Sequence, residues 1–114
     1  MELSEPDVKI VVGDAVVEFL KSNFTNVRYL DFSDDVFGIS FQCYSNYDVR
    51  FVINVHLSHL YLHAVRPSTN AGSFISQYEY SHPKFPQNLY QRLLKLPSQS
   101  WEEIVRASGL CLVS

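Results

Sequence analysis

Residues 36–67 contain three consecutive runs in which apolar and polar side chains alternate along the chain. The apolar sets are Phe37, Ile39, Phe41 and Cys43 in the first run, Val49, Phe51, Ile53, Val55 and Leu57 in the second, and Leu60, Leu62 and Ala64 in the third. Successive side chains of a β-strand point to opposite faces, so a period of two is typical of a sheet with one buried face. Many of these residues are β-branched or aromatic, which favours strands. The pattern predicts an antiparallel meander.

The two connections within these runs set the expected register. Ser58-His59 fits a two-residue turn that pairs Leu57 with Leu60 and places Val52 opposite Val65. The earlier connection falls within residues 45–48. Because a one-residue slip turns every side chain to the other face, we expect a loop of three or five residues there.

The segment before the sheet predicts a helix from Ser4 to Asn23. Its apolar residues recur at helical spacing: Val8, Val11, Val12, Ala15, Val16, Phe19 and Leu20. Ser4 is a suitable N-cap. Residues 27–32 then read as a short strand.

After the sheet, residues 67–72 have the composition of a loop, and residues 73–85 predict an extended or irregular crossover that contains a proline. A short helix follows from residue 86 or 87 to Pro97. Ser100 and Glu103 form a capping box for a last helix over residues 100–108. The sequence therefore predicts a single two-layer α+β domain over residues 1–114, with an N-terminal helix, a meander of three or four strands and two C-terminal helices.

Composition narrows the class of protein. The length of 114 residues fits one domain, and a hydrophobic content of 46% is enough for a core. A net charge of −3 without a basic cluster argues against a nucleic-acid partner. No apolar run approaches the roughly 18 residues of a membrane span, so no membrane association is expected. Cys43 and Cys111, without a secretory signal, are expected to be reduced thiols of an intracellular protein.

Histidines form the first candidate site. His56, His59 and His63 lie around one predicted hairpin, and His56 and His63 are expected near Tyr61 on the polar side of the sheet. These residues suggest a ligand-binding or acid–base site. A metal site needs more ligands, with supporting carboxylates, than this side of the sheet provides, so we expect neither a metal nor another cofactor.

Aromatic side chains form the second candidate site. Tyr61, Val52 and Val65 are expected on the outer side of the sheet, and Tyr78 and Tyr80 in the crossover. Tyrosine is favoured at protein interfaces, and a sheet face this apolar needs either the chain's own helices or another molecule to cover it. We expect these five residues to bind a partner protein or a second copy of the chain.

The order of elements resembles that of RWD domains, and the segment Tyr80-Ser81-His82-Pro83-Lys84-Phe85-Pro86 is similar to the tyrosine–proline loop of that family, although not in its usual form. The resemblance implies a domain without enzymatic activity that binds other proteins. The favoured hypothesis is therefore a non-catalytic interaction domain. The alternatives are a viral accessory, bacterial immunity or secretion-chaperone type of binding protein, and a small enzyme or ligand-binding protein that uses His56, His63 and Tyr61.

Overall fold

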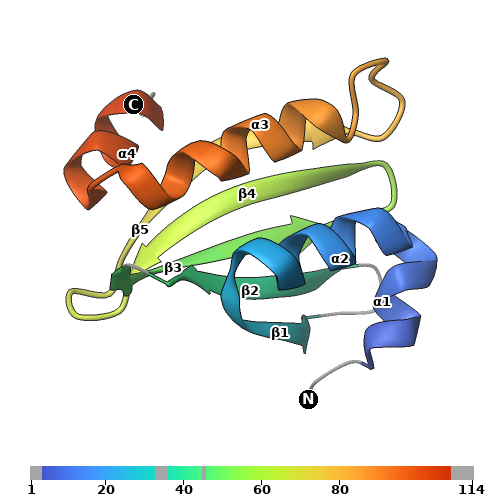
Figure 1. Ribbon diagram of the computed structural model, residues 1–114, viewed down its shortest axis with the longest axis horizontal. Coiled ribbons are helices and arrows are strands. Elements are labelled where there is room, and N and C mark those ends of the chain that lie inside the picture. Colours follow the sequence, from blue (N-terminus) through green and yellow to red (C-terminus); the bar gives the residue numbers. More distant parts are fainter. Residues whose placement is uncertain (1–3, 33–35, 45, 109–114) are drawn as a thin grey trace.

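The computed structural model describes residues 4–32, 36–44 and 46–108, and these form an α+β fold (Figure 1). Its elements are α1 (Glu5–Val12), α2 (Asp14–Asn23), β1 (Thr25–Asp31), β2 (Phe37–Cys43), β3 (Asn46–Val55), β4 (His59–Arg66), β5 (Ala71–Glu79), α3 (Gln87–Lys95), the 3-10 turn η1 (Leu96–Ser98) and α4 (Trp101–Ser108). The strands form one antiparallel sheet in chain order, β1-β2-β3-β4-β5. The predicted fold class is confirmed, but the sheet has five strands and not three or four.

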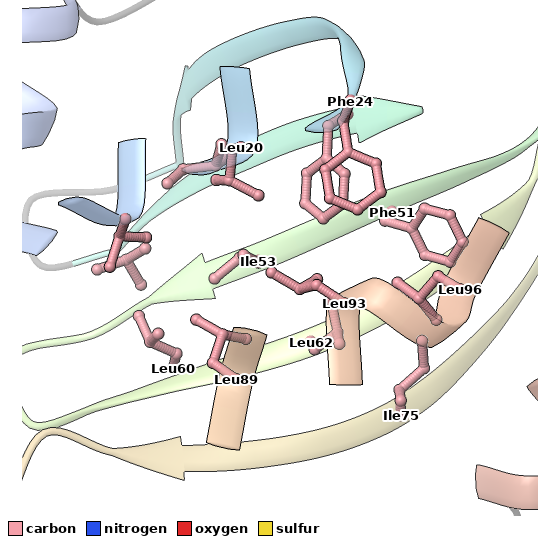
Figure 2. Packing of buried hydrophobic residues seen from close by; sticks show 14 of the residues in the cluster. Leu20, Phe24, Phe51, Ile53, Leu60, Leu62, Ile75, Leu89, Leu93 and Leu96 are labelled. Atoms are coloured by element: carbon pink, nitrogen blue, oxygen red, sulfur yellow. The ribbon is translucent and has the colours of Figure 1, made fainter. Parts of the chain in front are cut away.

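The helices and the sheet form two layers with the core between them. We call the sheet face that packs on the helices the inner face. In Figure 1, α2 lies over the β1–β2 side of the sheet and α3 over the β4–β5 side. Figure 2 shows the contact from close by, with Leu89, Leu93 and Leu96 of the helical segment beside Leu60, Leu62 and Ile75 of the sheet. None of the helices in the described ranges is long and apolar enough to cross a membrane.

The N-terminal helix is divided at Gly13, which differs from the continuous helix that the sequence predicts. Gly13 has a φ of 94°, a conformation open mainly to glycine, and it separates α1 from α2. The change of direction alters which residues are buried. Val11 and Ala15, expected in the apolar stripe, are exposed, whereas Val17 is fully buried.

The β3–β4 turn lies one residue earlier than predicted. The backbone N–H of His56 donates to the carbonyl of His59, at 2.9 Å, so the turn residues are Leu57 and Ser58. Leu57, expected on the buried face, is 81% exposed at the tip of the hairpin. The register moves by two residues, so Val55 and not Leu57 pairs with Leu60. Because the shift is even, each side chain of both strands keeps its predicted face.

The β2–β3 connection is also shorter than expected. β2 ends at Cys43 and β3 begins at Asn46, where the sequence predicts a longer loop. The pairing shifts between Phe41 and Cys43, which marks a β-bulge. We expected an odd number of loop residues to keep Cys43 and Phe51 on one face. The bulge adds the one extra residue instead, so both side chains still lie on the inner face.

The fifth strand replaces most of the predicted irregular crossover. β5 forms the edge of the sheet, and its pairing with β4 changes register between Leu62 and His63. Leu62 pairs with Ser76 and His63 with Phe74, which leaves Ile75 as the extra residue of a bulge. The bulge reverses the alternation halfway along the strand, and this explains why residues 73–79 show no single period in the sequence.

Candidate interaction surface

The outer face, which is the sheet face opposite the helices, is an ordered array of side chains. Cross-strand pairing arranges them in rows. From β1 to β5, the Tyr61 row reads Leu30, Gly38, Asn54, Tyr61 and Gln77, and the His63 row reads Arg28, Ser40, Val52, His63 and Phe74. The His56 row, with His59 and Glu79, flanks the first of these, and the Arg50 row, with Val65 and Gly72, flanks the second.

Five rings on β4, on β5 and at the residue that follows β3 form a continuous group that we call the ring strip: His56, His59, Tyr61, His63 and Phe74. The His56 and His59 rings stack, with centroids 5.2 Å apart and an interplanar angle of 15°. The ring of Tyr61 stands edge-on to both, at 5.0 and 4.7 Å. It also lies 6.4 Å from His63 and 6.2 Å from Phe74. Tyr61 is therefore the centre of the strip.

At the far end of the strip, His63 is half-buried and Phe74 is exposed. The rings of His63 and Phe74 meet edge to face with centroids 5.6 Å apart. Burial lowers the pKa of His63, because desolvation disfavours the imidazolium form. At the near end, Ser58 Oγ lies 2.7 Å from Nδ1 of His59. The lowered pKa of His63 favours its neutral form at pH 7, which suits contact with apolar or aromatic groups.

The other half of the outer face is covered by the chain's own side chains. Arg50 donates to Oγ of Ser40 at 2.8 Å, and Asn26 donates to Oε1 of Gln42 at 2.8 Å. Ser40 and Gln42 are consequently buried although they point away from the helices. The ring of Phe32 covers Gly38. The β1–β2 half is thus covered by two polar contacts and by the ring of Phe32, whereas the β3–β5 half carries the contiguous ring strip.

The two valines predicted for the surface lie on the outer face but do not face one another. Val52 pairs with His63, and Val65 with Arg50, because of the shifted β3–β4 turn. Both side chains are half-buried. Val52 extends the ring strip toward β2, and Val65 continues it beyond His63 along β4.

Tyr78 does not belong to this surface, and its expected exposure is wrong. It pairs with Leu60 on the inner face, is 7% exposed and accepts a 2.7 Å hydrogen bond from Ser76 Oγ. Burial raises the pKa of its phenol. The bulge at Ile75 turns Tyr78 toward the helices, which the sequence pattern did not indicate.

Tyr80 has a supporting position and not an exposed one. Its hydroxyl donates to the carbonyl of His56 at 3.2 Å, and its ring meets Phe85 edge-on at 5.5 Å. Burial raises the pKa of Tyr80 to about 12. The side chain holds the end of β5 against the β3–β4 turn, and so it positions the strip without forming part of it.

Two members of the strip, His59 and Phe74, were not predicted to bind a ligand or a partner, although His59 was noted with the other histidines of the hairpin. His59 shares a face with Tyr61 by simple alternation, so a correct turn would have placed it there. Phe74 lies before the bulge in β5, where the sequence shows no clear period. Phe74 is 42% exposed, and it extends the strip to the edge of the sheet.

The arrangement brings the rings of His56 and His63 to the same tyrosine, Tyr61. The strip is held together by ring stacking and edge contacts. Within residues 4–32, 36–44 and 46–108, no group of three or more His, Cys, Asp or Glu side chains is placed to hold a metal ion. Comparison of the chain with protein-family models, curated proteins and solved structures gives no match.

Proposed function

We propose that this chain is a non-catalytic protein-interaction domain that binds a protein through the ring strip and the adjacent valines of its outer face. The supporting observation is the contrast between the two faces of the sheet. The helices pack on the inner face, whereas the outer face carries five contacting rings. A sheet face that stays in water is usually polar, so a contiguous set of rings there favours contact with another molecule.

The chemistry of the strip fits a protein surface as its ligand. Aromatic side chains are enriched in the centres of protein interfaces, and charged side chains are depleted there. Tyr61 offers a large rigid ring with a polar tip, and His63 and Phe74 extend the contact area beside it. The predicted resemblance to RWD domains supports the same function through the order of elements, although the fifth strand departs from the predicted meander.

Site-specific photo-cross-linking tests the proposal. A benzoylphenylalanine at Phe74 replaces one exposed ring by another on the strip, and the same group at Ile10 provides a matched control, since Ile10 is 82% exposed on α1. In cells that naturally make the chain, irradiation is expected to give a discrete adduct from position 74 and none from position 10. Equal yields from both positions, or no adduct from position 74, would contradict the proposal.

A further inference from the structure

We infer that the protein bound by the outer face is a second copy of this chain, packed face to face with its strands running opposite to those of the first. The inference rests on the proposed function and names the partner. Three features of the outer face carry it: its size, the distribution of charge over its rows and the symmetry that its rows permit.

The size of the face suits a small dimer. Five strands spaced at about 4.8 Å, each seven to ten residues long at about 3.3 Å a residue, give a face of roughly 600 Å² before the side chains are counted. A stable interface buries about 800 Å² on each partner, and side chains standing out from the sheet add area to the flat estimate. Two aligned sheets pack about 10 Å apart, with strands within about 30° of one another.

The two central rows carry almost no charge, which allows the face to meet its own copy. In the Tyr61 row and the His63 row the only charged side chain is Arg28, at the β1 end. The acidic side chains of the helices, such as Glu5, Glu18 and Glu102, lie on the other layer. An acidic partner would find few cations at the centre of this face. The same face of a second copy carries equally few charges, so its rings can pack against the rings of the first copy.

The rows also select one of two possible two-fold axes. An axis along β3 would place Arg50 against Arg50 of the second copy, and like charges in an interface are unfavourable. An axis across the strands exchanges the rows. It places Tyr61 against His63 of the second copy, and Asn54 against Val52, in a self-complementary contact. We therefore assign the axis that crosses the strands.

The same axis makes the dimer sensitive to acid. It places His63 opposite Tyr61 of the second copy, at the centre of the interface and away from the water that stabilises an imidazolium. Protonation of His63 puts a charge into the centre of the interface. Only Glu79, next to His59 on β5, offers a carboxylate to the imidazoles among the described outer-face rows. Because the second copy excludes more water from His63, the pKa of His63 falls further in the dimer, and proton binding therefore favours the separated chains.

Sedimentation equilibrium of the purified full chain tests the inference. At pH 7.5 we expect a species of twice 13.1 kDa, with a dissociation constant at least about tenfold higher at pH 5.0. Val52→Lys and Phe74→Ser are expected to weaken the dimer tenfold or more, and the matched exposed substitution Ile10→Lys to leave it unchanged. His63→Phe is expected to retain the dimer and reduce its pH dependence. Circular dichroism of each variant verifies that the fold is retained.

The outcomes separate this inference from the proposed function. A chain that remains monomeric at pH 7.5 up to about 100 μM overturns the second copy as partner. If position 74 then still cross-links a protein of another mass, the proposed function stands without this inference. If it cross-links nothing, both fail. A dimer that withstands both Val52→Lys and Phe74→Ser, or that strengthens at pH 5.0, overturns the inference as well.

Discussion

The ring of Phe32 occupies the space in which a side chain at position 38 would begin. A β-carbon built on Gly38 would lie 2.5 Å from Cε2 of Phe32, although the ring itself is 53% exposed. Gly38→Ala is therefore expected to displace the ring and to destabilise the protein by less than about 1 kcal/mol. In a Phe32→Ala background the same substitution is expected to stabilise by about 0.5 kcal/mol, because alanine is preferred to glycine within a strand. A double-mutant cycle of urea unfolding measures the difference, and additive effects would contradict the contact.

Two tyrosines that look alike in the sequence are expected to differ strongly in their effect on stability. Tyr78 is buried on the inner face, whereas Tyr61 lies half-buried on the outer face. Tyr78→Ala removes a core ring and is expected to lower the free energy of unfolding by about 3–5 kcal/mol. Tyr61→Ala is expected to lower it by about 1 kcal/mol or less at protein concentrations at which the chain is monomeric. Chemical denaturation of both variants checks the contrast, which similar losses would refute.

Gly13 is expected to be irreplaceable for conformational reasons alone. Its φ of 94° and ψ of 148° lie where only glycine is comfortable, yet a β-carbon there would meet no atom within 4 Å. Gly13→Ala is therefore expected to destabilise by about 1–3 kcal/mol without any clash. Ser22→Ala, at an exposed position of α2, is the control and is expected to be neutral or slightly stabilising. A loss below about 0.5 kcal/mol for Gly13→Ala would show that this backbone conformation is not required.

Cys43 is expected to be an unreactive thiol. It is 2% exposed, and burial raises its pKa to about 11, so only about one molecule in a thousand carries the thiolate at pH 8. Cys111 lies outside the described residues, and Cys111→Ser leaves Cys43 as the one cysteine of the 114-residue sequence. In this variant, labelling of Cys43 by iodoacetamide is expected to be at least about a hundredfold slower in buffer than in urea. Equal rates in the two solvents would place the thiol at the surface.

The same pKa shift predicts a loss of stability in alkali. The folded state keeps the Cys43 thiol protonated, whereas the unfolded chain releases the proton near pH 9. The stabilisation is therefore complete below pH 9 and decreases as the pH rises toward 11. Urea unfolding between pH 8 and pH 11 is expected to show a smaller decline in Cys43→Ala than in the parent chain. Parallel declines would rule out a contribution from this thiol.

Alternation in the sequence identified the sheet and assigned faces correctly in β3 and β4, because burial on one side leaves a period of two. It did not determine the position of the turn. A turn at Ser58-His59 and a turn at Leu57-Ser58 leave the same side chains of both strands on each face of the sheet, so alternation cannot distinguish them. In the structure the turn lies at Leu57-Ser58: Leu57 is exposed, and the backbone N–H of His56 donates to the carbonyl of His59. A cross-strand pair of imidazoles has no signature in a single sequence.

Local irregularities account for the remaining differences. The bulge at Ile75 hides β5, and the positive φ of Gly13 divides a helix whose apolar spacing continues across the break. The capping box at Ser100 and Glu103 was predicted correctly and is confirmed, with hydrogen bonds of 2.9 and 3.2 Å in the two directions. Caps are short-range features that residue type alone specifies, whereas bulges depend on the strand alongside.

The meander has a consequence for how the chain acquires its structure. Each strand pairs only with strands adjacent in the sequence, so the sheet can assemble hairpin by hairpin with little loop-closure entropy at each step. The helices come from opposite ends of the chain and close over the same side of that sheet. Ribosomal synthesis delivers α3 and α4 after the whole sheet, so the apolar side that they cover waits exposed until residue 108 has been made.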